Sequence, residues 1–83
     1  MMIKNNKKFK ISALKKLKSG KIIKRYTSSL IKMKKWILGQ NFKSIIITCK
    51  WDEGKNSAVY STKKDAIFFI NQNYDDYKYY KDR

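Results

Sequence analysis

The chain has 83 residues, a formal net charge of +15, 42% hydrophobic residues and no histidine. This length allows one small domain, and the hydrophobic content excludes a fully disordered chain. No apolar run approaches the ~20 residues that span a bilayer, and a single cysteine, Cys49, excludes an internal disulfide. We therefore expect one soluble, cytoplasmic domain without a membrane span.

The net positive charge is confined to one part of the sequence. Residues 1–50 hold fourteen lysines, one arginine and no Asp or Glu, whereas the remaining residues hold as many acidic as basic side chains. A genome rich in A and T would favour lysine over arginine, but it would not keep acids out of this segment. The asymmetry therefore indicates an anionic partner, and nucleic acid is the leading candidate.

The N-terminal part is expected to be a flexible arm followed by a short helix. Residues 1–8 are polar and basic without periodicity, which predicts a flexible arm before one domain that spans 9–83. Residues 9–18 predict a short helix with Ser12 as its cap and Gly20 as its stop. Two helical turns are unstable alone in water, so this helix has to pack on the rest of the domain.

Residues 21–38 have the strongest helical pattern. Apolar side chains recur every three or four residues and form one face, and basic side chains form the opposite face. The apolar face holds Ile22, Tyr26, Leu30, Met33 and Ile37, and the basic face holds Lys21, Lys24, Arg25, Lys32 and Lys35. In an alternative, 21–26 is a strand and a helix begins after a cap at Thr27 or Ser28, because the β-branched residues here are poor helix formers. We favour one helix, since its two faces separate cleanly.

Residues 43–61 predict a β-hairpin, which a C-terminal helix follows. Along 43–51, inward-facing Ile45, Ile47, Cys49 and Trp51 alternate with Ser44, Ile46, Thr48 and Lys50. A turn at 52–56 leads into a second strand over 57–61. Thr62 then caps a helix that runs to about Tyr80, with Asp65 completing a capping box. The sequence thus predicts a small α+β domain with a basic amphipathic helix or helices, a short antiparallel sheet and no internal repeat.

The run Ser61-Thr62-Lys63-Lys64-Asp65-Ala66 resembles a junction found in two known families. It is similar to the last strand and lysine-headed second helix of double-stranded-RNA-binding domains, and to the sheet-to-helix junction of arm-type DNA-binding domains of phage integrases. The resemblance implies that Lys63 and Lys64 contact phosphates. Both families place three strands before the helix, where this sequence shows two, and the resemblance is limited to this run.

Side chains suited to catalysis are scarce, so we expect no enzyme, no metal site and no cofactor. Histidine is absent, and the neighbouring acids fall in a turn or on a solvated helix face. The three glycines lie singly and form no phosphate-binding loop. Cys49 alternates with inward-facing isoleucines, so it is expected to be buried.

The basic face of 21–38 is the expected binding surface for DNA or RNA. Lysine is a point charge that suits phosphates better than base edges, so little base-specific readout is expected. The candidate nucleic-acid-binding residues are Lys21, Lys24, Arg25, Lys32, Lys35, Lys63 and Lys64. The alternative is a phage or mobile-element inhibitor, an anti-defence or host-takeover factor, that docks its basic face on an acidic protein or a nucleoprotein complex.

The aromatic side chains divide into a core set and a surface set. Tyr26 and Trp51 lie on core-facing stripes and are expected to be buried. Trp36, Phe68 and Tyr79 lie off those stripes, so they are expected to face a partner or a second copy of the chain in a homodimer.

Overall fold

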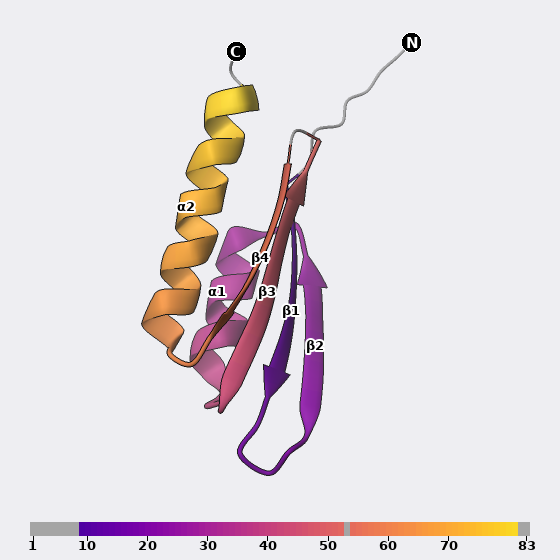
Figure 1. Cartoon of the computed structure of the whole chain (residues 1–83), viewed down its shortest axis with the longest axis vertical. Coiled ribbons are helices and arrows are strands. Elements are labelled where there is room, and N and C mark those ends of the chain that lie inside the picture. The colour runs from indigo at the N-terminus through magenta and orange to yellow at the C-terminus, as the bar shows by residue number, and fades with distance from the viewer. Residues whose placement is uncertain (1–8, 53, 82–83) are drawn as a thin grey trace.

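The computed structural model describes residues 9–52 and 54–81, which form one antiparallel sheet and two helices. The elements in chain order are β1 (Lys10–Lys16), β2 (Ile22–Thr27), α1 (Leu30–Gly39), β3 (Ser44–Trp51), β4 (Gly54–Tyr60) and α2 (Lys63–Lys81). The strand order is β2-β1-β3-β4, and both helices lie on the same side of the sheet (Figure 1). The α+β class, the hairpin within 43–61 and the C-terminal helix are confirmed. The expected arm at 1–8 lies outside the described residues.

The fold consists of two β-β-α units in tandem, although the sequence shows no repeat. The strand order is β2-β1-β3-β4, so the first unit forms one half of the sheet and the second unit forms the other half in mirrored order. Each helix also begins in the same way. The backbone N–H of Lys32 donates to Ser29 Oγ at 3.2 Å, and that of Asp65 donates to Thr62 Oγ1 at 3.2 Å. The tandem units therefore place β1 and β3 at the centre of the sheet and leave β2 and β4 at its edges.

The two caps give a direct test of how the helices are initiated. Ser29→Ala or Thr62→Ala removes the side-chain acceptor of one otherwise unsatisfied N–H, so each variant should lose about 1 kcal/mol of unfolding free energy. Urea unfolding followed by circular dichroism measures this loss. Ser61→Ala, one residue before the second cap, is the matched control and should change stability by less than about 0.5 kcal/mol. A cap variant as stable as the parent would contradict the assignment.

The single helix expected over 21–38 is wrong, and the alternative of a strand followed by a helix is correct. The helix begins at Leu30 after Ser29, slightly later than the cap considered at Thr27 or Ser28. The β-branched residues at the start of the segment pair with β1 instead of forming a helical turn. Of the expected apolar face, Met33 and Ile37 are buried, whereas Ile22 and Tyr26 are 59% and 66% exposed.

The short helix expected over 9–18 is also wrong, because this segment is the central strand β1. Its side chains alternate with a period of two, so Ile11 and Ala13 face the helices and are buried. Gly20 does not stop a helix. It lies in the turn between β1 and β2 with φ of 94°, a left-handed conformation that other residues rarely adopt.

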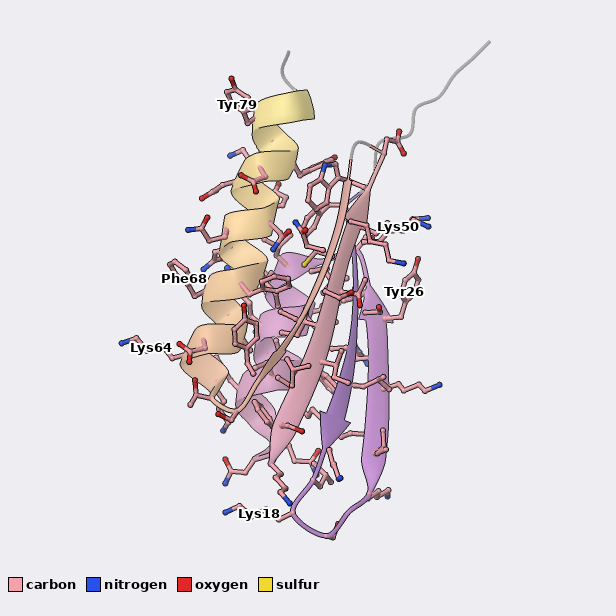
Figure 2. The ribbon with its side chains drawn as sticks, viewed as in Figure 1. Lys18, Tyr26, Lys50, Lys64, Phe68 and Tyr79 are labelled. Atoms are coloured by element: carbon pink, nitrogen blue, oxygen red, sulfur yellow. The ribbon has the colours of Figure 1, made fainter. Side chains whose placement is uncertain are left out.

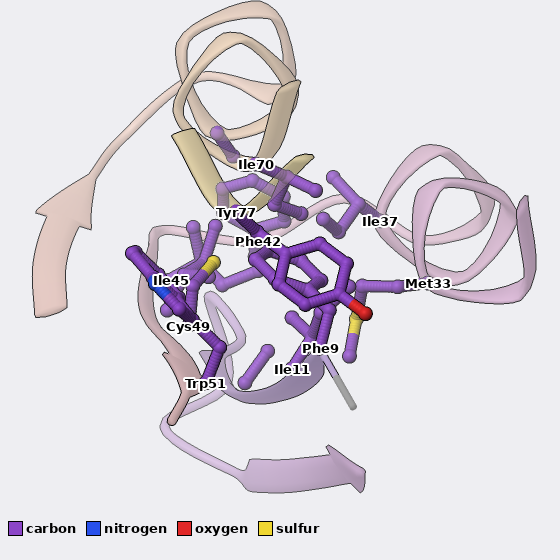
Figure 3. Packing of buried hydrophobic residues seen from close by; sticks show 13 residues of the cluster. Phe9, Ile11, Met33, Ile37, Phe42, Ile45, Cys49, Trp51, Ile70 and Tyr77 are labelled. Carbon is purple, nitrogen blue, oxygen red and sulfur yellow. The ribbon is translucent and has the colours of Figure 1, made fainter. Parts of the chain in front are cut away.

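The core lies between the sheet and the two helices, and every element except the edge strands contributes fully buried side chains to it (Figure 3). Ile45, Ile47 and Cys49 of β3 face the helices with Trp51, as their alternation predicts. Phe9, just before β1, contacts the Trp51 ring at a centroid distance of 5.7 Å and the Tyr77 ring at 5.3 Å. The predicted burial of Trp51 and Cys49 is confirmed.

One core-facing position of β1 holds a lysine. The side chain of Lys15 is fully buried, and its ammonium group donates to the carbonyl oxygen of Trp36 and lies 4.3 Å from the centroid of the Trp36 ring. Lys63 Nζ donates to the carbonyl oxygen of Leu38 at 3.1 Å. The two lysines thus bond carbonyl groups at the C-terminal end of α1, where cations interact favourably with the helix dipole. Burial lowers the pKa of Lys15, and the nearby charge of Lys63 lowers it further.

Candidate nucleic-acid interface

The side of the sheet opposite the helices forms a second, solvent-facing surface, which we call the open sheet face. Strand pairing determines which side chains share it, because directly paired residues of antiparallel strands point to the same side. Its members are Lys10, Ser12, Leu14, Lys16, Ile22, Lys24, Tyr26, Ser44, Ile46, Thr48, Lys50, Lys55, Ser57 and Val59. None of these positions holds Asp or Glu. The face is therefore uniformly basic wherever it is charged.

Directly paired side chains form rows across this face, and the first two rows are each of one chemical kind, lysine and then hydroxyl-bearing residues. From β4 through β3 and β1 to β2, successive rows are Lys55–Lys50–Lys10, then Ser57–Thr48–Ser12–Tyr26, then Val59–Ile46–Leu14–Lys24, and last Ser44–Lys16–Ile22. Neighbouring rows lie two residues apart along each strand, which is about 6.8 Å. The hydroxyls of Thr48 and Ser57 are 2.8 Å apart, as expected for side chains of one row.

The first row, which we call the lysine row, brings three ammonium groups together. Lys10, Lys50 and Lys55 are directly paired on neighbouring strands, an arrangement in which like charges repel and destabilise the sheet. All three side chains are exposed and, with Tyr26, line a hollow of about 280 Å³. A bound anion would relieve the repulsion, so this row is a candidate anion-binding feature of the open sheet face.

Tyr26 stands between the lysine row and an apolar part of the same face. It was expected in the core, and this expectation is wrong, because β2 is an edge strand whose Tyr26 side chain points away from the helices (Figure 2). A second hollow, of about 470 Å³, lies on the open sheet face and is lined by Tyr26, Leu14, Ile46 and Lys24 among others. The sheet therefore combines an exposed aromatic ring, aliphatic side chains and lysines on one surface.

The structure does not bring the expected basic residues onto one helix face. Lys24 lies on the open sheet face, but its neighbour Arg25 points to the other side of the sheet. Lys32 and Lys35 are exposed on α1, and Lys21 lies in the turn before β2. A strand places consecutive side chains on opposite sides of the sheet. Basic residues that would share one face of a helix are therefore separated where the segment is a strand.

The lysines at the start of α2 have different environments. Lys63 is partly buried and bonds the end of α1, whereas Lys64 is exposed and projects from the opposite side of the molecule to the open sheet face (Figure 2). The strand arrangement of the two resembling families is not reproduced, because α1 interrupts the strands that precede α2. The fold therefore gives no support to the phosphate contacts that the resemblance implied for Lys63 and Lys64.

Sequence reasoning missed Lys10, Lys16, Lys50 and Lys55 as candidates. A signal for part of this set was present, because the alternation along 43–51 already placed Lys50 on the outward side with Ile46 and Thr48. The pairing of Lys50 with Lys10 could not be predicted, because β1 was not predicted to be a strand. Only the pairing of β1 with β3, and of β3 with β4, joins Lys10 and Lys55 to Lys50.

The three aromatic residues expected at a partner surface do not form one surface. Trp36 is half-buried and packs against the core beneath Lys15. Phe68 and Tyr79 are 62% and 61% exposed on the outer side of α2, well away from the open sheet face (Figure 2). Trp36 therefore contributes mainly to the core, and Phe68 and Tyr79 remain candidates for contacts with a partner.

The free cysteine of the described residues, Cys49, is buried in the core. Burial raises the pKa of the Cys49 thiol to about 12, so the thiolate needed for nucleophilic chemistry is scarce at neutral pH. Within 9–52 and 54–81, no three His, Cys, Asp or Glu side chains gather as a metal site requires. In the same residues, no helix is both long enough and apolar enough to cross a membrane.

Comparisons with protein-family models, with curated proteins and with solved structures find no match, so function is inferred from this chain's own residues.

Proposed function

We propose that the protein binds nucleic acid through the open sheet face. The observation that carries this proposal is the lysine row beside the exposed ring of Tyr26, on a face without acidic side chains. Lysine ammonium groups bind phosphate oxygens as point charges. Strand registry directs no arginine side chain to this face, and arginine is the residue whose planar fork reads guanine edges, so binding is mostly independent of base sequence. The proposed interface therefore lies on the sheet, and not on the helix face that the sequence predicted.

The dependence of affinity on salt tests this function. Purified protein freed of nucleic acid by nuclease and high salt should bind fluorescent oligonucleotides, and the logarithm of the affinity should fall linearly with the logarithm of the salt concentration. The slope is about −0.7 per phosphate contact on a single strand and −0.9 on duplex DNA, so three to five contacts give a slope of about −2 to −4.5. Fluorescence anisotropy with DNA and RNA probes measures it. Absent or salt-independent binding to every probe would reject the proposal.

An acidic protein partner is the second candidate, in which the chain acts as an inhibitor of the phage or mobile-element type. One observation favours it. Val59 and Ile22 are exposed on the open sheet face, at 62% and 59%, and protein interfaces have apolar centres. A pull-down from nuclease-treated lysate distinguishes the two functions. The inhibitor would be favoured if the chain retains one acidic protein in a one-to-one ratio, and if variants of the open sheet face no longer retain it.

A further inference from the structure

Tyr26 separates two hollows of different chemistry on the open sheet face. The smaller hollow is lined by the lysine row, and the larger one by the aliphatic side chains of Leu14 and Ile46 with Lys24 and Arg25 at its side. Ser12 and Thr48 line both hollows, so the two lie side by side with Tyr26 at their boundary. Figure 2 shows Lys50 and Tyr26 projecting from the same side of the sheet, away from the helices.

This juxtaposition matches the two ends of a nucleotide. A base is flat and apolar on its faces, and it stacks on an exposed tyrosine ring with any base identity. A phosphate is anionic and suits the lysine row. Lys10 lies one row, about 6.8 Å, and one strand, about 4.8 Å, from Tyr26. All three lysines line one hollow with Tyr26, so their ammonium groups are within reach of phosphates next to a base that lies on its ring.

We propose that the open sheet face holds a nucleotide subsite for single-stranded nucleic acid, in which a base stacks on Tyr26 while Lys10, Lys50 and Lys55 each contact one of the neighbouring phosphates of the strand. This inference rests on the proposed function and specifies its substrate. Ser12 and Thr48 lie between the two hollows and offer hydroxyl groups to the sugar or to the base edge.

Single strands fit this subsite better than a duplex does. Stacking on Tyr26 requires an open base face, whereas the bases of a duplex are covered by their stacked neighbours and present only their edges. Edge recognition favours arginine or amide side chains, and strand registry directs neither kind to the open sheet face. A duplex would therefore use the lysines alone.

An oligonucleotide without bases separates stacking from charge. Oligo-dT of about 12 nucleotides and an abasic strand of the same length carry the same phosphates, and both fall within the span of a small binding surface. The parent protein should bind the abasic strand about 5- to 150-fold more weakly, the change that corresponds to about 1–3 kcal/mol for one base stacked on an aromatic side chain. Competition against fluorescent oligo-dT, at one fixed salt concentration, measures both affinities.

Three variants locate the effect. Tyr26→Thr keeps a strand-forming residue at this edge but removes the ring, so oligo-dT and the abasic strand should bind equally. Tyr26→Phe keeps the ring and should keep the preference. Phe68→Ala removes a similarly exposed ring from α2 and should also keep it. Circular dichroism of each variant verifies that the sheet is intact.

The outcomes separate the subsite from the general function. Equal binding of the two strands by the parent protein would overturn the stacking subsite and leave phosphate binding by the lysine row in place. A preference for oligo-dT that survives Tyr26→Thr would overturn the role of Tyr26. Failure of the parent protein to bind either strand at low salt would overturn the proposed function together with the subsite.

Discussion

Replacing Lys10, Lys50 and Lys55 together with glutamine should weaken binding of single-stranded DNA by about 100-fold at about 0.1 M salt. Each lost phosphate contact on a single strand removes about 0.7 from the salt slope, so three contacts remove about 2, which corresponds to this loss of affinity at that concentration. Glutamine keeps the length and polarity of the side chain and removes only its charge. Anisotropy titrations of parent and variant across a range of salt measure both the affinity and the slope.

A second triple variant with the same change in charge is the control. Lys32, Lys35 and Lys64 are exposed on the two helices, away from the open sheet face. Their replacement with glutamine should change affinity by less than about 5-fold, since exposed charges beyond a Debye length of about 10 Å are largely screened. Equal losses from the two variants would mean that binding follows total charge, and a larger loss from the helix variant would restore the helix face as the interface.

The lysine-row variant should not lose its fold. Directly opposed like charges destabilise a sheet, and each relieved pair contributes roughly 0.2–1 kcal/mol. We therefore expect the variant to be at least as stable as the parent in urea unfolding at low salt. A loss of affinity accompanied by a gain in stability would identify the row as a binding feature, whereas a loss of both would indicate a structural role.

The buried Lys15 should show opposite effects of two substitutions. Lys15→Ala leaves a cavity beneath α1 and removes the donor to the Trp36 carbonyl, so it should lose about 2–4 kcal/mol of unfolding free energy. Lys15→Met keeps most of the volume without the buried charge, so it should stay within about 1.5 kcal/mol of the parent at neutral pH. Urea unfolding of the three proteins measures these differences. A Met variant as unstable as the Ala variant would show that the ammonium group itself is required.

The effect of pH isolates the charge of Lys15. Burial lowers its pKa in the folded protein below the ordinary value of 10.5. At a pH between the lowered pKa of Lys15 in the folded protein and its ordinary pKa in the unfolded chain, mainly the unfolded chain holds the proton. The stability of the parent therefore rises with pH in that window. The unfolding free energy of the parent minus that of Lys15→Met should therefore rise between pH 7 and about pH 10. Using this difference cancels the titration of the other groups, and a difference independent of pH would contradict the lowered pKa.

Local patterns predicted the second half of the fold. The alternation along β3 and the capping sequence at Thr62 are short-range signals, and both the strand and α2 follow them. The first half failed because its decisive contacts are distant in sequence. β1 is a strand through its pairing with β3, and β2, at the edge, has no buried residue to create an alternating pattern. Its apolar residues instead continued by chance the helical spacing of α1.

The sequence by itself predicted the class of partner. An acid-free segment that carries the whole net charge implies an anionic ligand whatever fold it adopts, because charge balance does not depend on structure. The tertiary structure decided which lysines lie side by side. The lysine row joins Lys10 and Lys50 of that segment to Lys55 of the neutral remainder, through two strand pairings that no local pattern encodes. The same pairings turn Tyr26 outward beside the row, since antiparallel registry fixes the side of the sheet to which every side chain points.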